Sequence, residues 1–135
     1  IDGAAHRGAL AVGGKTIAVL GSGVNIAYPP EHAALAEEVT ALVSEQHPDT
    51  NPSAPTLVAR NRIISGVSQA VIVIEAGNQS GSLHCARFAI KQARPVVVMD
   101  TKAEGNRVLL AEGALPLRPD FDNWDSLIAA LSAAY

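Results

Sequence analysis

The chain has 135 residues, of which 48% are hydrophobic, 17% charged and only 4% aromatic. This length suits one compact domain with an aliphatic core, which needs neither disulfides nor a structural metal to fold. The single cysteine, Cys85, cannot form an internal disulfide, and no Cys or Cys/His spacing indicates a zinc module. The net charge of −3 argues against indiscriminate attraction to nucleic acid or anionic lipid, but it permits a local basic site.

Strand-like and helix-like segments alternate along the chain, which predicts an α/β fold with a Rossmann-like parallel sheet and helices on both faces. The chain opens at Ile1 as if inside a helix, whereas a doubly wound domain opens with a strand. We therefore interpret residues 1–135 as a single domain whose opening strands are absent and whose upstream residues are missing.

The strands are predicted from β-branched, continuously apolar runs. Three such runs, typical of strands buried on both faces, are residues 15–20, 70–75 and 95–100. Residues 41–44 are expected to form a short strand. Residues 113–117 are expected to form an edge strand, because Pro116 lacks the amide that an inner strand would donate.

The helices are predicted from apolar stripes with helical spacing. Three of them lie between the strands, at residues 29–40, 58–67 and 82–93. A fourth, at residues 123–131, presents one apolar face that we expect to dock on the sheet with Trp124 as a core anchor. Residues 47–56 are rich in Pro, Ser and Asn and are interpreted as a surface loop.

Ligands of open parallel sheets bind beyond the carboxyl ends of the strands, so the segments that follow each strand are candidate sites. After the first strand, Gly21, Ser22 and Gly23 permit close backbone approach to an anion. A turn that needs glycine for its geometry alone is an equally good explanation.

Two further turns carry polar side chains. Ser80, Gly81 and Ser82 precede a helix, where backbone amides and a hydroxyl can cradle a phosphate, although either serine can instead be a plain N-cap. At another helix start, Arg60 and Arg62 flank Asn61 and point in different directions, so that one can meet a phosphate while the other pairs with an internal carboxylate. A solvated charged face is the ordinary alternative for these arginines.

The sequence contains no motif that is typical of an enzyme active site. No GxSxG nucleophile elbow, HExxH motif or carboxylate cluster with metal-ligand spacing is present, so we expect no catalytic residue and no bound metal.

No apolar run approaches the ~18 residues that span a bilayer, and the first residues lack the basic-then-apolar pattern of a signal peptide. We expect a cytoplasmic protein with no membrane contact.

Taken in order, several motifs make the sequence resemble the DprA/Smf family of DNA-processing proteins. The motifs are Ile1-Asp2-Gly3 with Ala5-His6 and Ala9-Leu10, Gly21-Ser22-Gly23 through Tyr28-Pro29, Ser44-Glu45, Arg60-Asn61-Arg62-Ile63-Ile64-Ser65-Gly66, Glu75-Ala76 with Ser80-Gly81-Ser82, and Asn106 to Ala114.

The resemblance implies a homodimeric Rossmann-like domain without a cofactor that binds and protects single-stranded DNA. It further implies handover of the strand to a RecA-type recombinase during DNA uptake and transformation. Its basic pocket along the strand ends would be formed by Arg7, Gly21, Ser22, Gly23, Arg60, Asn61, Arg62, Ser80, Gly81 and Ser82.

The chain departs from the family pattern in two places. A Ser-Gly-x-Ala-Arg-Gly segment that usually precedes the position of Ile1 is absent, and Leu57 and Ala59 replace a common aromatic and a common basic residue. Loss of a stacking aromatic removes on the order of 1 to 3 kcal/mol of base contact. We therefore expect weaker DNA binding than is typical of the family.

The sequence leaves two other functions open. Related Rossmann-like folds include nucleoside-phosphate-hydrolysing enzymes, so a nucleotide-binding or phosphoribohydrolase-like protein is the alternative, although its Pro-Gly-Gly-x-Gly-Thr turn is replaced here by residues 77–82. A reduced family member that serves as an interaction module is the third interpretation.

Overall fold

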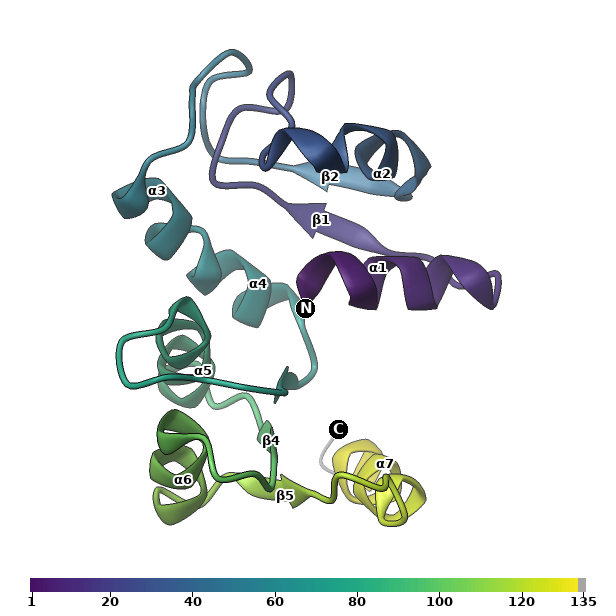
Figure 1. Ribbon diagram of the computed structural model, residues 1–135, viewed down its shortest axis with the longest axis vertical. Coiled ribbons are helices and arrows are strands. Elements are labelled where there is room, and N and C mark those ends of the chain that lie inside the picture. The colour runs from purple at the N-terminus through teal and green to yellow at the C-terminus, as the bar shows by residue number, and fades with distance from the viewer. Residues whose placement is uncertain (134–135) are drawn as a thin grey trace. The chain divides into compact units, whose positions relative to one another are not determined.

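The computed structural model describes residues 1–133, and the chain divides into two compact units (Figure 1). One unit is Ile1–Arg60 and the other begins at Asn61. Each contains a parallel sheet with helices around it, which confirms the predicted α/β class. That residues 1–135 act as a single domain stays a prediction.

The first unit holds a two-stranded sheet. Helix α1 (Asp2–Ala11) occupies the start of the chain, as expected. Strand β1 (Ile17–Val19) pairs in parallel with β2 (Ala41–Val43). Ile17 is 54% exposed, so the prediction of a strand buried on both faces is wrong for β1: at its first residue the strand has solvent rather than a helix beside it.

The helices of the first unit differ in their bounds from the prediction. Between the strands lie a 3-10 turn, η1 (Pro30–His32), and α2 (Ala33–Glu38), which ends because Val39 adopts an extended conformation. The loop predicted for residues 47–56 is shorter, since α3 (Ala54–Ala59) begins within it. The signal for this start is a capping box, in which Ser53 and Thr56 bind each other's backbone amides.

The second unit is built on a three-stranded parallel sheet in the order β3-β4-β5. All four residues of β4 are buried, and Pro116 lies on the edge strand β5, as predicted. In β3 the middle residue, Ile72, is 42% exposed, so burial on both faces is wrong there too. The elements are α4 (Asn61–Val67), β3 (Val71–Val73), α5 (Gly81–Lys91), β4 (Val96–Met99), α6 (Glu104–Ala111), β5 (Leu115–Leu117) and α7 (Trp124–Ala133).

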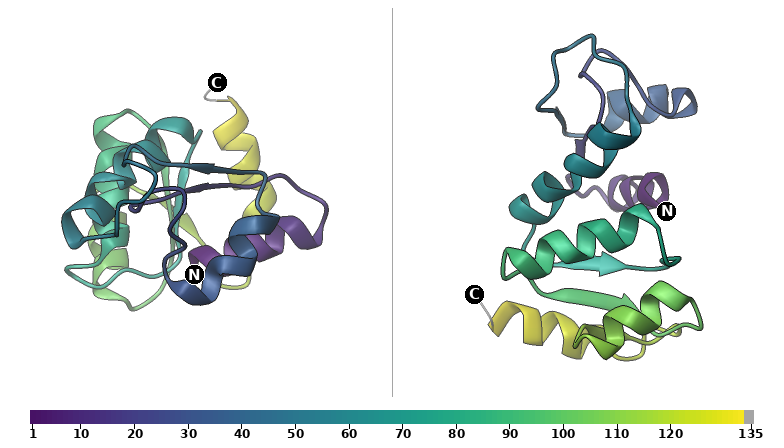
Figure 2. Two further views of the ribbon diagram at one scale, coloured as in Figure 1. Left: turned by 90° about the horizontal axis from the view of Figure 1, so that it is seen from above. Right: turned by 90° about the vertical axis from the view of Figure 1, so that its left-hand side faces the viewer.

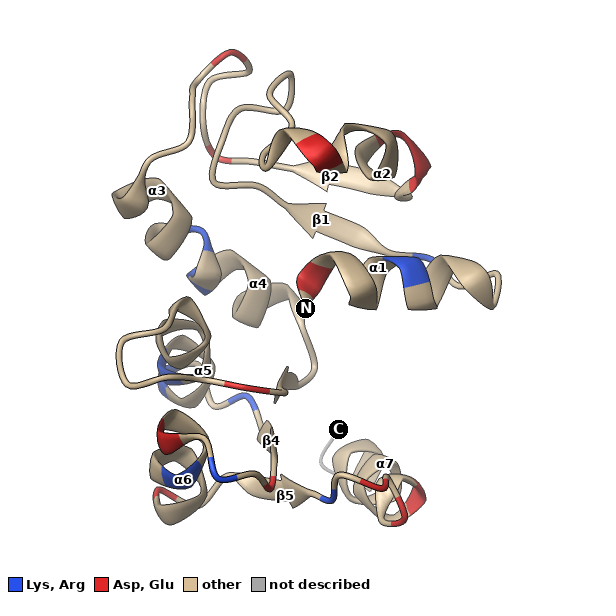
Figure 3. Ribbon diagram, in the orientation of Figure 1, with Lys and Arg blue, Asp and Glu red and all other residues tan. Residues whose placement is uncertain are grey.

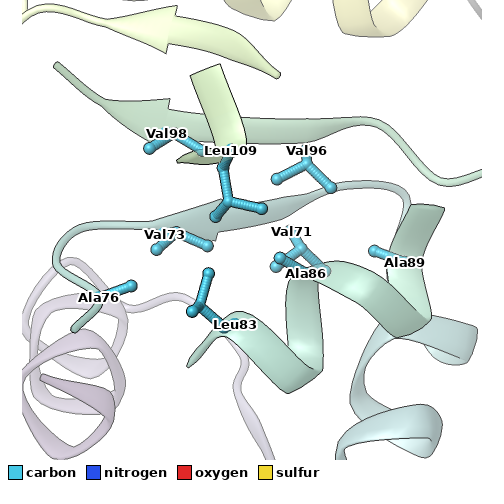
Figure 4. Packing of buried hydrophobic residues seen from close by; sticks show 9 residues of the cluster. All are labelled: Val71, Val73, Ala76, Leu83, Ala86, Ala89, Val96, Val98 and Leu109. Carbon is cyan, nitrogen blue, oxygen red and sulfur yellow. The ribbon is translucent and has the colours of Figure 1, made fainter. Parts of the chain in front are cut away.

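Helices cover both faces of this second sheet because side chains alternate along each strand. On one face, α5 and α6 pack on β3 and β4, and Leu83 and Leu109 meet valines of both strands (Figure 4). On the other face, Val97 and Leu117 pack with Leu127 of α7. Figure 2 shows α5 running along the sheet.

Two expectations for helices need correction. The helix predicted at residues 58–67 is two helices, α3 and α4, with Arg60 between them. Trp124 is not a core anchor: it is 36% exposed and lines a depression of about 310 Å³ with Phe121 and Asp125. On α7 the buried residue is Leu127, because its position in the helix turns it toward the sheet.

A fully buried amide, that of Asn106, joins the carboxyl ends of β3 and β4. Its Oδ1 accepts a hydrogen bond from the Ala76 amide at 2.8 Å. Its Nδ2 lies 2.9 Å from the Ile74 carbonyl oxygen and 2.8 Å from that of Met99. The neighbouring Gly105 allows this approach, since a Cβ there would lie 2.6 Å from the Ala76 oxygen. One side chain thus fixes the backbone from which both following loops start.

We predict that Asn106→Ala lowers the free energy of unfolding by about 2 to 4 kcal/mol, because it leaves buried backbone groups without partners. Urea unfolding followed by circular dichroism measures the loss. The control is Asn78→Ala, which removes an exposed amide and should cost little. Equal stability of the two variants would contradict this role for Asn106.

Candidate nucleic-acid interface

The glycines after β1 are required by the packing of the first unit itself. A Cβ on Gly23 would lie 2.1 Å from the Pro48 carbonyl oxygen, and one on Gly21 would lie 2.8 Å from the Leu57 side chain. The Gly23 amide donates to the Thr50 carbonyl at 2.8 Å. The close approach that these glycines permit is made by residues of the chain, as the geometric explanation of the motif expects.

Ser22 joins the same loop to its surroundings. It is 2% exposed, and its hydroxyl donates to the Ile26 carbonyl at 2.8 Å. Its own carbonyl accepts from the Ser44 hydroxyl at 2.6 Å, which links the loop after β1 to the residue after β2. A role of Gly21, Ser22 and Gly23 in binding a ligand stays a prediction.

The two arginines of the Arg-Asn-Arg motif have different surroundings, as their opposite directions predict. The half-buried Arg60 donates from its guanidinium to the Val19 carbonyl, at the carboxyl end of β1. This acceptor is a backbone carbonyl, and the pairing of one arginine with an internal carboxylate stays a prediction. Arg62 belongs to the second unit and is exposed on α4. Arg62 is therefore the better placed of the two to meet a phosphate from solvent.

Asn61 positions the start of α5. Its side chain is buried, with 6% of the residue exposed, and Nδ2 donates to the Gly81 carbonyl at 3.2 Å. Its carbonyl accepts from the Ser65 hydroxyl at 3.1 Å, inside α4. Asn61 therefore ties the helix that carries Arg62 to the turn that carries Gly81, and its role in the structure is one of positioning.

The turn before α5 contains one buried polar atom without a hydrogen-bond partner among the described residues. The helix begins at Gly81, one residue earlier than predicted, with Ser80 at the N-cap. The Ser80 hydroxyl makes no capping hydrogen bond, and its oxygen is buried without a partner among residues 1–133. Gly81 is exposed, and a Cβ there would meet nothing within 4 Å. Ser82 is half-buried in the first turn of the helix.

Arg7 lies in the first unit, exposed on α1. Its Nη1 is 3.4 Å from the position that a Cβ on Gly3 would take, and the His32 ring is 2.8 Å from the same point. Gly3 thus allows α1 to pack closely, which explains this part of the N-terminal motif in structural terms.

Sequence reasoning missed what Asn106 does, although it included the residue in a motif. The available signal was an asparagine directly after glycine in the first turn of a helix that follows a buried strand. Within residues 1–133, no group of three or more His, Cys, Asp or Glu side chains is arranged to hold a metal ion. No helix in that range has the length and apolar character needed to cross a bilayer.

Several known proteins are similar to this chain in sequence or in fold. The family model for DNA recombination-mediator protein A matches residues 1–129. Protein Smf of Escherichia coli (strain K12) is 46% identical over 124 residues, which are 85% of this chain and 33% of that protein. DNA processing protein DprA of Streptococcus pneumoniae is 39% identical over 122 residues, which are 84% of this chain and 43% of that protein. The chain therefore spans less than half the length of these two relatives.

Two solved structures are similar in fold. The X-ray structure of DprA from Streptococcus pneumoniae has a TM-score of 0.81 at 38% identity and covers 86% of this chain and 44% of its own. DNA processing protein A from Helicobacter pylori, whose structure concerns its binding of single-stranded DNA, has a TM-score of 0.76 at 28% identity. That match covers 89% of this chain and 57% of the Helicobacter chain.

The two kinds of glycine in the interface are expected to respond differently to an added methyl group. Gly23→Ala should lower the free energy of unfolding by about 1 to 3 kcal/mol or more, because the methyl overlaps backbone carbonyls. Gly81→Ala should leave stability unchanged or raise it by up to about 1 kcal/mol, because alanine favours helix and the position is open.

Thermal and urea unfolding of both variants test this expectation. A destabilised Gly81→Ala, or a Gly23→Ala as stable as the parent chain, would contradict it.

Proposed function

Because the chain belongs to the DNA recombination-mediator protein A family, we propose that it binds single-stranded DNA and protects it without catalysing a reaction. The observation that carries the proposal lies in the second unit. There the buried Asn61 links the arginine-bearing helix α4 to the start of α5, where Ser80 has a buried, unpartnered hydroxyl oxygen and Gly81 is open to solvent.

The chemistry of this turn suits a phosphodiester. Backbone amides at the start of an α-helix donate to anions, and the helix dipole adds partial positive charge. The first turn of α5 carries no acidic side chain that would compete for the amides. Arg62, an exposed residue of the neighbouring helix, adds a full positive charge, and arginine can bind two phosphate oxygens at once.

The distribution of acidic and basic residues along the chain also favours a phosphate site near the turn before α5. Between residues 61 and 99 the only acidic residue is Glu75, against four basic residues, namely Arg62, Arg87, Lys91 and Arg94. This segment therefore has a net charge of +3, whereas the whole chain has a net charge of −3. Contacts to phosphates carry no sequence information, and we therefore propose binding that is independent of base sequence.

The first unit contributes its own candidates to the same function. Arg7 is exposed there, and Gly21, Ser22 and Gly23 follow the carboxyl end of β1. The family resemblance assigns these residues to DNA contact, together with Arg60, Asn61 and Ser82. Because the glycine loop and Arg60 are bonded within the unit, we propose that they position the backbone, and that direct contact falls to exposed groups.

The function has a wider setting that we also propose. The protein acts in the cytoplasm as a homodimer that receives single strands during DNA uptake and hands them to a RecA-type recombinase. Contacts to phosphates alone suit such a role, because they hold a strand whatever its sequence is. They also release the strand when the concentration of salt or of a competing protein rises.

Light scattering of the purified chain tests the dimer, and a monomer at micromolar concentration would contradict it.

We predict that single-stranded oligonucleotide binding weakens steeply with salt. Arg62→Ala should lower affinity alike for all sequences and reduce the slope of log K against log salt by about 0.7, the value for one phosphate contact. The control is Arg107→Ala, which removes an equally charged and exposed side chain from α6. Fluorescence anisotropy at several salt concentrations measures both variants.

Two outcomes would contradict the proposal. One is failure of the parent chain to bind a strand at low salt, or binding that salt does not affect. The other is thermal stabilisation by nucleoside monophosphates but not by oligonucleotides, which would favour the nucleotide-binding alternative.

Handover predicts a specific behaviour with a recombinase. On an oligonucleotide coated by this protein, a fluorescent RecA-type recombinase should assemble, and the coating protein should leave the strand as it does so. The matched control is the same strand coated by an unrelated single-strand binder. If the recombinase is excluded at every ratio of the two proteins, handover is wrong while DNA binding stands.

A further inference from the structure

The outward face of α5 carries a row of basic side chains outside the turn described above. His84, Arg87 and Lys91 are exposed and follow one another at helical spacings of three and four residues (Figure 3 shows the Lys and Arg of α5 in blue). Phe88 lies among them, half-buried, and the four side chains line a shallow depression of about 230 Å³. We call these four residues the α5 stripe.

The α5 stripe is held in a fixed orientation. Leu83, Ala86 and Ala89, on the opposite side of the helix, are at most 4% exposed and pack against β3 and β4. Turning the helix would expose this apolar surface, so His84, Arg87 and Lys91 must face solvent. From Gly81 to Lys91 the helix extends about 15 Å, at about 1.5 Å per residue.

Acidic side chains are absent from the helix of the stripe and from α4, which packs against it. Arg87 and Lys91 form no ion pair with any of residues 1–133. An acid-free basic row in a chain of net charge −3 is complementary to an anion, and its length exceeds that of a single phosphate group.

We infer that the α5 stripe is a second nucleic-acid contact, which binds the phosphates of a single strand as the strand continues from the start of α5 toward Lys91. The inference rests on the proposed function, because the strand must first be held at the turn of Ser80 and Gly81. Arg87 and Lys91 lie about 6 Å apart along the helix axis, close to the separation of neighbouring phosphates in an extended strand.

Phe88 makes the stripe better suited to a nucleic acid than to an acidic protein segment. An aromatic ring among cations offers an apolar surface for a base or sugar beside each phosphate contact, which is the combination that single-strand binders use. His84 adds a ring and a hydrogen-bonding nitrogen at the end nearer the start of the helix.

The test uses the whole chain and two lengths of oligo(dT), about 5 and about 30 nucleotides. The double variant Arg87→Gln/Lys91→Gln removes both charges and keeps both exposed stems. Its affinity for the long strand should fall at least tenfold, and its salt slope should decrease by about 1.4, the value for two single-strand phosphate contacts. Its affinity for the short strand, which is held at the turn, should change less than threefold.

The matched control is Lys15→Gln/Arg107→Gln, which makes the same change of charge at an exposed position between α1 and β1 and at one on α6. Melting temperatures of all three proteins establish that each is folded. The inference is overturned if the stripe variant binds the long strand like the control, or if it loses equal affinity for both lengths. If the parent chain binds neither strand at low salt, the proposed function itself fails, and that result is distinct from either outcome.

Discussion

The buried amide of Asn106 is the interaction on which the second unit most depends. Parallel strands end with backbone groups that no further strand partner satisfies, and a buried group of this kind is costly unless another group bonds it. Asn106 has an acceptor for the Ala76 amide and donors for the carbonyls of Ile74 and Met99. It thereby fixes the segment that leads from β3 to the turn before α5.

A second buried amide, Asn61, has the corresponding role one layer away. It holds the Gly81 carbonyl from the first residue of α4, so Asn61 fixes the start of α5 while Asn106 fixes the segment that leaves β3. Both residues are at most 6% exposed, and their side chains form hydrogen bonds within the second unit. They explain why a turn that contains the flexible residue Gly81 can keep a defined position, as a preformed site for an anion requires.

The basic residues near the turn before α5 determine which kind of ligand this turn suits. The chain as a whole is acidic, yet α4 and α5 contain no carboxylate and carry Arg62, Arg87 and Lys91. We propose on this basis that a long polyanion binds at α4 and α5, where backbone amides and basic side chains belong to the same or adjacent helices. This arrangement favours recognition of a sugar-phosphate backbone over recognition of bases or of a small substrate.

The sequence alone determined the α/β class, the three aliphatic strand positions and the family resemblance, because strand and helix periodicities and short motifs depend on local order. It also indicated that Arg60 and Arg62 point apart, since residues two apart on a helix do not share a face. The tertiary structure decided which partner each polar group meets. Gly23 and Ser22 proved to serve packing, Trp124 proved to be exposed, and Asn106 proved to join two strand ends. These properties depend on contacts between residues far apart in the chain, on which composition and periodicity carry no information.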